Sequence, residues 1–405
     1  MEQAILKNYA RLIARTGVNV QPGQDVWIEA ELDQPEFVVM LSEACYEAGA
    51  RTVRADWTHQ PLQRLHTRYR SEEALSEVRP WEVEKLRDFA EHLPCRIYLL
   101  SEDPDGLAGL DAEKFTAARQ RRQQIAKPFR DQAENRYQWC IAAVPGAAWA
   151  RKLFGDAPDG QEQLWRAILT SARAMDDPIA AWEAHNRDLK ARCDRLNSLG
   201  IRSLHYTAPN GTDLTVGMMP EGRFRGGAET SLQGIVFQPN IPSEEVFISP
   251  RRGEAEGVVY GTMPLSWQGQ LIEGLRLRFE KGRVVEASAD KNEALLQKLV
   301  AMDEGASYLG ECALVPWDSP IRNGGLLFYN TLFDENAACH LALGAGFCDT
   351  VDGFEHRSLA ECRALGVNDS IIHEDFMIGC AGLNVDAQTI SGETAAIFRA
   401  GNWAF

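Results

Sequence analysis

The sequence predicts an α/β amino-terminal domain with a mainly parallel sheet, followed by a β-rich α+β carboxyl-terminal domain. Helical and strand patterns alternate up to about residue 155, whereas short β-branched segments and glycine-containing turns dominate beyond residue 200. A chain of 405 residues is also too long for one ordinary hydrophobic core. We therefore expect two domains, residues 1–199 and residues 200–405.

The amino-terminal domain is predicted from its alternation of helices and strands. Ile5, Tyr9 and Leu12 recur at helical spacing within residues 1–16, and the turn at residues 21–24 ends this helix. The next predicted helices cover residues 34–48, several segments between residues 60 and 90, and residues 111–133, with a kink or interruption expected at Pro128. The predicted strands cover residues 25–30, 51–57, 95–100 and 137–144. Strands separated by helices of this length favour a parallel sheet.

Residues 160–199 have an almost continuous helical pattern and are expected to connect the two domains. Beyond Ile201 the pattern changes, and Asn210-Gly211 between two short apolar runs is a strong hairpin signal. Further strands are predicted at residues 257–262, 271–280 and 283–287, followed by a helix at residues 291–302. The second domain is therefore expected to be mainly antiparallel.

Composition excludes several classes of function. The formal net charge is −16 with no basic block, which disfavours binding to nucleic acid or to an anionic membrane surface. The amino terminus lacks a secretory signal, and no run of about 18 apolar residues is present to span a bilayer. Nine cysteines without a CxxC pair are typical of a reducing compartment. We therefore expect a cytoplasmic protein with no disulfide framework.

Metal-ligating side chains occur in strongly patterned segments of the second domain. Two imidazoles and three carboxylates form a ligand set that zinc, cobalt, manganese or iron(II) accepts. Five such groups exceed the needs of one tetrahedral ion and suit two ions that share a bridging carboxylate. The candidates are Glu245, Glu311, His340, His373 and Asp375.

Each histidine candidate has an ordinary alternative. If residues 370–379 form a strand, His373 and Asp375 lie on one face and can reach one metal ion, while Glu374 lies on the other. The alternative is a surface hydrogen bond between His373 and Asp375. His340 lies among small and apolar residues, where a core histidine bonded to the backbone is the alternative. The neighbouring Cys339 would diverge from His340 and is expected to be structural.

The glutamates also leave alternatives open. Glu311 interrupts an apolar strand, where a buried carboxylate needs a partner such as a metal ion; solvent exposure is the alternative. Glu244 and Glu245 are adjacent, and the residue pattern alone does not choose between them or exclude a solvated charge pair. The chain contains no HExxH helix, GxSxG elbow or Walker-type loop that would indicate another chemistry.

The order and spacing of these groups resemble the metallopeptidase family of aminopeptidase T, aminopeptidase S and PepS. From Glu245 the successive candidates follow after 66, 29, 33 and 2 residues. The matching segments are PSEEVF (242–247), NTLFDENAACHLALG (330–344), HEDFMIG (373–379) and FRAGNWAF (398–405). The resemblance is dense in the second half of the chain, extends more weakly over the rest, and favours Glu245 over Glu244.

The resemblance implies a cytoplasmic homodimeric exopeptidase that removes N-terminal residues from peptides with a free N terminus. It implies an α/β domain paired with a β-rich domain that binds two divalent ions: zinc, cobalt or magnesium. By this resemblance the ligands are Glu245, Glu311, His340, His373 and Asp375. Glu311 is also the catalytic candidate, as bridging ligand or as base, and hydrolysis is expected to use a metal-bridged water.

One position departs from the family. Members often carry a tyrosine seven residues after the first histidine ligand, whereas this chain has Phe347, with Tyr329 or Tyr260 as candidate replacements. Mononuclear iron(II) ring-cleaving dioxygenases of the dihydroxypyridine type resemble the same family, and the missing tyrosine keeps that alternative open. The presence of all five candidate ligands argues against it. A non-catalytic metal-binding protein is the remaining alternative.

Overall fold

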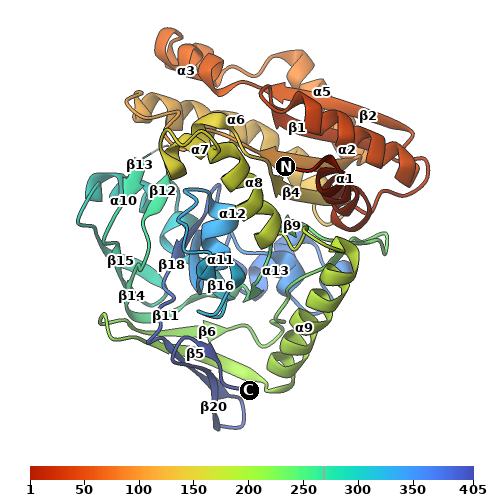
Figure 1. The fold of residues 1–405 in the computed structure, drawn as a ribbon. Helices are drawn as coiled ribbons and strands as arrows, with labels where there is room; N and C mark the ends of the chain where they lie inside the picture. The colour runs from red at the N-terminus through yellow and green to blue at the C-terminus, as the bar shows by residue number, and fades with distance from the viewer. Residues whose placement is uncertain (268–269) are drawn as a thin grey trace. The chain divides into compact units, whose positions relative to one another are not determined.

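The computed structural model describes residues 1–267 and 270–405, which divide into two compact units (Figure 1). The first unit comprises Met1–His185 and Ala228–Ser243, and the second comprises Asn186–Gly227 and Glu244–Phe405. The division therefore lies within helix α9 (Pro178–Ser198), and a short later segment returns to the first unit.

The first unit contains a five-stranded sheet in which every pairing is parallel, in the order β2-β1-β3-β4-β9. Its strands are β1 (Asp25–Glu31), β2 (Thr52–Thr58), β3 (Cys95–Leu100), β4 (Trp139–Ala143) and β9 (Asn240–Ile241). In β1 the side chains of Val26 and Ile28 are fully buried, as alternation along a strand requires. A separate two-stranded sheet pairs β7 (Glu229–Thr230) with β8 (Val236–Phe237).

Helices precede, connect and follow the first four parallel strands. They are α1 (Gln3–Leu12), the π-helix η1 (Ile13–Gly17), α2 (Pro35–Ala48), α3 (Gln60–Tyr69), α4 (Glu72–Ser76), α5 (Pro80–His92), α6 (Ala112–Ala133), α7 (Ala147–Phe154) and α8 (Gly160–Ser171). Proline occupies the first turn of α2, α3 and α5, where its missing N–H costs nothing. Gly49 ends α2 with a φ of 111°, a conformation that favours glycine.

Two local predictions differ from the structure. The predicted interruption at Pro128 is absent, because α6 runs through this proline and loses only one backbone donor. The predicted continuous helix over residues 160–199 is broken between α8 and α9, where Arg173 has a φ of 53°. Both differences arise at single residues, Pro128 and Arg173, whose backbone conformation cannot be predicted from the spacing of apolar residues.

The second unit contains an eight-stranded antiparallel sheet in the order β15-β14-β11-β6-β5-β19-β20-β21. Its strands are β5 (Ile201–Thr207), β6 (Asp213–Met218), β11 (Pro250–Tyr260), β14 (Arg276–Glu280), β15 (Arg283–Ser288), β19 (Asn384–Thr389), β20 (Thr394–Arg399) and β21 (Asn402–Trp403). The predicted hairpin joins β5 to β6, and Gly211 in its turn has a φ of 100°.

A four-stranded antiparallel sheet, in the order β10-β16-β17-β18, forms the centre of the second unit. Its strands are β10 (Val246–Ile248), β16 (Leu309–Leu314), β17 (His340–Gly344) and β18 (His373–Met377). Every residue of β16 and β17 is buried. One hydrophobic cluster joins this sheet to the eight-stranded sheet, and includes Cys312, Leu341, Leu204 and Val259.

The remaining elements of the second unit are short. They are the paired strands β12 (Leu265–Trp267) and β13 (Gln270–Ile272), the helices α10 (Glu293–Val300), α11 (Pro320–Asn323), α12 (Thr331–Asp334) and α13 (Leu359–Leu365), and the 3-10 helices η2 (Gly305–Ser307), η3 (Glu335–Ala337), η4 (Cys348–Thr350) and η5 (Phe354–His356). The parallel sheet with its helices and the β-rich remainder confirm the predicted fold class.

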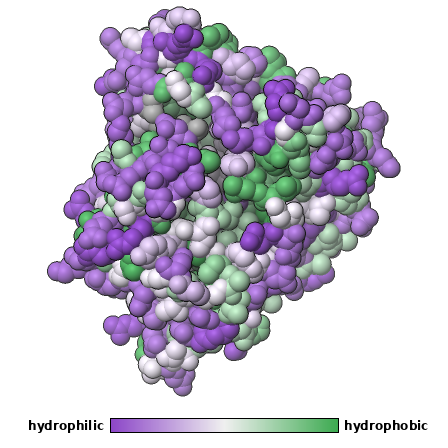
Figure 2. All heavy atoms as spheres, turned by 60° about the vertical axis from the view of Figure 1, so that its left-hand side comes forward, coloured by the Kyte–Doolittle hydropathy of each residue, from purple (hydrophilic) through white to green (hydrophobic). Residues whose placement is uncertain are grey.

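The face of the molecule drawn in Figure 2 is mainly polar. Figure 2 shows hydrophilic residues over most of the visible face, with apolar residues gathered in smaller areas. Among the helices that the structure describes, none combines the length and the apolar character needed to cross a bilayer.

Candidate metal centre

The register of three neighbouring strands places four of the five candidate side chains on one face of the central sheet. Glu311 on β16 and Asp375 on β18 both pair with Ala342 on the intervening strand β17. His340 lies two positions before Ala342, and His373 lies two positions before Asp375. Directly paired residues and residues two apart share a face, so these four side chains project together. The small Ala342 leaves room between them.

Glu245 reaches the same region from the residue just before β10, the strand that pairs with β16. Its Oε2 lies 3.2 Å from His340 Nε2. His373 Nε2 lies 3.0 Å from Glu311 Oε2 and 3.4 Å from Asp375 Oδ1. The structure therefore brings all five candidates together.

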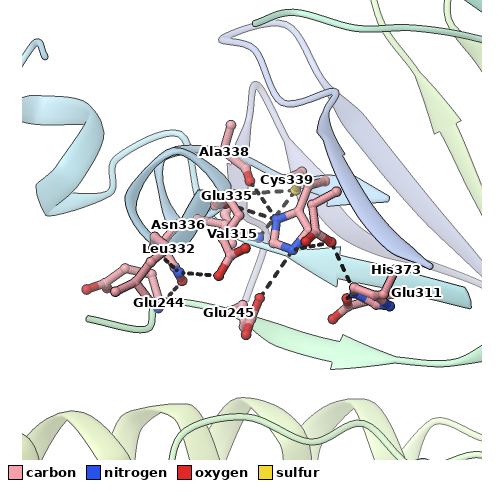
Figure 3. A network of polar contacts seen from close by, with 12 residues as sticks. Glu244, Glu245, Glu311, Val315, Leu332, Glu335, Asn336, Ala338, Cys339 and His373 are labelled. Carbon is pink, nitrogen blue, oxygen red and sulfur yellow. Dashed lines mark hydrogen bonds and ion pairs between the residues drawn. The ribbon is translucent and has the colours of Figure 1, made fainter. Parts of the chain in front are cut away.

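The five side chains form two overlapping groups of three. Glu245, Glu311 and His340 form one group, and Glu311, His373 and Asp375 form the other; within each group the ligand atoms lie within 4.8 Å of one another. Glu311 belongs to both groups. Figure 3 shows Glu311 beside His373, with Glu245 approaching from the segment just before β10. This arrangement could hold two cations with one shared carboxylate.

Backbone carbonyl groups orient both imidazoles. His340 Nδ1 lies 2.9 Å from the Glu335 carbonyl oxygen, and His373 Nδ1 lies 2.7 Å from the Ala345 carbonyl oxygen. A carbonyl oxygen can only accept, so each Nδ1 carries a proton and donates. Each Nε2 is then directed at the carboxylates, as it is in histidines that bind a metal.

Burial places these charges in a low-dielectric environment. Glu311 is 4% exposed and His340 is 1% exposed. Burial raises the pKa of Glu311 to about 7, although its hydrogen bond to His373 opposes the shift. Burial alone would lower the pKa of His340, but the carboxylates of Glu245, Asp375 and Glu311 raise it to about 10. Burial would likewise lower the pKa of His373, but Asp375 and Glu311 raise it well above its usual range. Both imidazoles therefore offset the negative charge of the carboxylates in the metal-free protein.

The donor set fits divalent cations. Burial alone would raise the pKa of Asp375, yet the charges of His373 and His340 hold it below its usual range. Its Oδ1 is buried, and no residue in the described part of the chain donates a well-formed hydrogen bond to it. Three buried carboxylates and two imidazole Nε2 atoms at this spacing match the nitrogen and oxygen ligands of zinc and related ions.

Glu335 is a further carboxylate that the sequence did not single out. It lies on η3, and Figure 3 shows it close to Asn336 and to the ligand groups. Burial and the charges of Asp375, Glu245 and Glu311 raise its pKa well above the usual range. In the sequence, the polar run Asp334-Glu335-Asn336 is typical of a solvated segment. The signal that could have identified Glu335 as a site residue is its position five residues before His340.

The other highlighted residues have different surroundings. Cys339 Sγ donates to the Val315 carbonyl oxygen at 3.2 Å, and Glu244 belongs to neither group of three. The Phe347 ring lies 4.7 Å from the His373 ring, centroid to centroid, and packs against the neighbouring Phe247. Phe347 therefore contributes an apolar surface beside one imidazole.

The two tyrosines considered as replacements for a hydroxyl differ in their surroundings. The Tyr260 hydroxyl accepts a hydrogen bond from Arg276 Nε at 3.3 Å, within the eight-stranded sheet. Tyr329 has a φ of 54°, and the Asp334 carboxylate accepts hydrogen bonds from the backbone on either side of it, at Phe328 and Asn330. Asp334 therefore fixes the segment that carries Tyr329.

Known proteins resemble this chain over its full length. The thermophilic metalloprotease (M29) family matches residues 2–403. Aminopeptidase 2 of Geobacillus stearothermophilus is 40% identical over 404 residues, which cover 99% of this chain and 98% of the relative. The structure of wild-type AmpT from Thermus thermophilus matches with a TM-score of 0.90 and 37% identity over the full length of both chains.

A 2,5-dihydroxypyridine dioxygenase from Pseudomonas putida KT2440 matches with a TM-score of 0.51 and 14% identity, over 98% of this chain and 96% of that chain. At that identity the likeness shows a shared fold alone. By contrast, the M29 family matches residues 2–403, and Aminopeptidase 2 is 40% identical to this chain, whereas the dioxygenase is 14% identical. The chain belongs to the thermophilic metalloprotease (M29) family.

Proposed function

We propose that this protein is a metal-dependent aminopeptidase that hydrolyses N-terminal residues from peptides. The observation that carries the proposal is the sharing of Glu311 between two groups of potential ligands. Full-length similarity to proteins named as aminopeptidases supports the same activity. Since all five proposed ligands lie in residues 200–405, we propose this part of the chain as the catalytic, metal-binding domain.

In this proposal Glu245, Glu311 and His340 hold one divalent ion, and Glu311, His373 and Asp375 hold the other. Zinc, cobalt and magnesium are the proposed ions, and the two imidazoles favour zinc or cobalt over magnesium. Two such ions, when bound, activate a water and polarise the scissile carbonyl. The protein supplies the fixed imidazole orientation and the shared carboxylate.

Two carboxylates have distinct proposed roles in the reaction. Glu311 is the proposed catalytic residue, because it is common to both groups and would be shared by the two ions. A carboxylate shared by two cations has few lone pairs left to accept a proton. Glu335 belongs to neither group, and we propose that its carboxylate moves a proton from the attacking water to the leaving amine.

The proposed substrate is a peptide with a free N terminus. The strongly acidic chain, with a net charge of −16, attracts a cationic amino group at long range. The described cysteines are all free thiols, which supports a reducing compartment, and we propose the cytoplasm. A homodimer is part of the proposal through the family resemblance alone.

A panel of aminoacyl-anilides tests the activity. Purified protein treated with a chelator should be inactive and should recover turnover with zinc, cobalt or magnesium. Glu374→Gln is a matched control, because Glu374 lies between His373 and Asp375 but accepts a hydrogen bond from Trp267 Nε1 at 3.2 Å instead. The control should retain activity. Absence of turnover with every substrate and metal would refute the proposal.

The same preparation separates the peptidase from the ring-cleaving alternative. Two bound ions per chain with peptide hydrolysis support the peptidase. About one iron per chain with oxygen uptake on a dihydroxypyridine would support a mononuclear dioxygenase.

A further inference from the structure

Two buried asparagine side chains, Asn336 and Asn368, hydrogen-bond to segments that carry or orient different ligands of the candidate centre. We propose that Asn336 positions the Glu245–His340 half of the centre and that Asn368 independently positions the His373 half. Asn336 is 0% exposed and Asn368 is 2% exposed. The inference rests on the proposed two-ion function and assigns different residues to the support of each ion.

Asn336 joins the two segments that carry Glu245 and His340. Its Oδ1 accepts a hydrogen bond from the Glu244 N–H at 2.6 Å, which fixes the backbone directly before Glu245. Its Nδ2 donates to the Leu332 carbonyl oxygen at 2.9 Å and to Glu335 Oε1 at 3.3 Å. Figure 3 shows Asn336 between Glu244 and Glu335. One amide therefore uses both its acceptor and its donors to hold this half together.

The contacts of Asn336 extend to the imidazole of His340. The Glu335 carbonyl oxygen, next to Asn336 in the chain, accepts from His340 Nδ1 at 2.9 Å. Ser319 Oγ in turn donates to the Asn336 carbonyl oxygen at 2.7 Å and anchors the segment from behind. Loss of the Asn336 amide would free Glu245 and Glu335 to move relative to His340. Residues that orient metal ligands typically change metal affinity by about 10–100-fold when removed.

Asn368 holds a different segment. Its Nδ2 donates to the Gly344 carbonyl oxygen at 2.6 Å and to the Gly305 carbonyl oxygen at 2.8 Å. The Asn368 carbonyl oxygen accepts from the Gly346 N–H at 2.8 Å. These bonds fix both neighbours of Ala345, whose carbonyl oxygen accepts from His373 Nδ1 at 2.7 Å.

The two hydrogen-bond sets have no residue in common. The partners of Asn336 are Glu244, Leu332, Glu335 and Ser319. The partners of Asn368 are Gly305, Gly344 and Gly346. If the asparagines only stabilised the fold, their loss would weaken the binding of both ions equally. If they position ligands, loss of Asn336 should weaken only the ion held by Glu245, Glu311 and His340. Loss of Asn368 should weaken only the ion held by Glu311, His373 and Asp375.

Single-ion backgrounds provide the test. His373→Ala leaves the group of Glu245, Glu311 and His340, and His340→Ala leaves the group of Glu311, His373 and Asp375. Cobalt(II) is titrated calorimetrically into each chelator-treated protein, with and without Asn336→Asp. This substitution keeps the side-chain volume and the acceptor for the Glu244 N–H, but it removes both donors, to the Leu332 carbonyl oxygen and to Glu335 Oε1. The segment whose Glu335 carbonyl oxygen orients His340 is then no longer held.

In the His373→Ala background, Asn336→Asp should raise the cobalt dissociation constant by about 10–100-fold. In the His340→Ala background the same change should alter it by less than about twofold. Asn368→Asp should give the reverse pattern, because a carboxylate cannot donate to the Gly344 carbonyl oxygen. Equal effects in both backgrounds, or no effect in either, would overturn the assignment.

Asn197→Ala is the control variant. Asn197 donates to the Phe224 carbonyl oxygen at 3.0 Å and accepts from the Phe224 N–H at 2.8 Å, so its loss removes two similar backbone bonds. It should leave cobalt affinity unchanged. If Asn336→Asp does not fold, judged by circular dichroism, Asn336→Ser is measured by the same criterion. Failure of the unsubstituted protein to bind two cobalt ions would instead refute the proposed function.

Discussion

Replacing Glu311 by glutamine should weaken the binding of both metal ions and, at the same time, stabilise the metal-free protein. The substitution keeps the shape of the side chain and removes one negative charge from a buried position that is 4% exposed. The weaker metal binding follows from the presence of Glu311 in both ligand groups. The gain in stability follows from the burial of its charge.

The gain in stability follows from the pKa of Glu311, which burial raises from 4.5 to about 7. One pKa unit corresponds to about 1.4 kcal/mol, so ionised Glu311 costs the metal-free fold roughly 3 kcal/mol above pH 7. The cost is absent below the unfolded-state pKa, grows as the pH rises and is complete above the folded-state pKa. The pKa of about 7 already includes the interaction with His373. A buried amide that replaces the carboxyl group pairs less well with its neighbours, which leaves a gain of about 1–3 kcal/mol at pH 8.

The loss of metal affinity follows from ligand number. Four-ligand zinc sites bind with about 10–16 kcal/mol, or roughly 3 kcal/mol per ligand, which corresponds to about a hundredfold in affinity. Glu311→Gln should impose this loss on both ions, whereas His340→Ala should impose it on one. Calorimetric titration with zinc, and urea unfolding of chelator-treated protein at pH 4 and pH 8, measure the two effects. A variant that binds two ions as tightly as the parent protein, or whose metal-free form is less stable at pH 8, would refute this reasoning.

Three further perturbations have defined outcomes. His340→Ala should lower kcat by at least about a thousandfold while circular dichroism stays unchanged; full activity would remove His340 from the ligand set. Chelation should lower the free energy of unfolding by about 4 kcal/mol per ion, or about 8 kcal/mol for both, relative to protein with metal at a thousand times its Kd. Added cobalt should reverse the loss; an unfolding curve indifferent to metal would contradict this. Gly344→Ala should destabilise the fold by at least about 2 kcal/mol in urea unfolding, because Gly344 has a φ of 104° and a Cβ would overlap the Ile372 carbonyl oxygen. A stable variant would show that this close approach can relax.

Much of the fold was predictable because it depends on local periodicity. The strand at residues 95–100 coincides with β3, and the Asn210-Gly211 turn marks the hairpin between β5 and β6. The two-residue strand β9 has no periodic pattern, so its pairing with β4 depends on tertiary contacts alone. Arg173 breaks the predicted helix by a left-handed backbone conformation that its residue type does not indicate.

The candidate site was predictable in residue type more than in arrangement. Histidine and carboxylate chemistry, together with the family spacing, selected five side chains that the structure brings together, and their role as ligands stays a prediction. The convergence itself depends on strand register, which sets Glu311 and Asp375 on either side of Ala342. Glu335 was missed because its burial results from residues distant in sequence, such as Asp375 and Glu245.

Anomalous diffraction from a crystal of the zinc- or cobalt-loaded protein tests the central claim most directly. We predict two peaks about 3.5–4 Å apart, both in contact with Glu311, one bound also by Glu245 and His340 and the other by His373 and Asp375. A single peak, or two peaks that do not share Glu311, would contradict the two-ion centre.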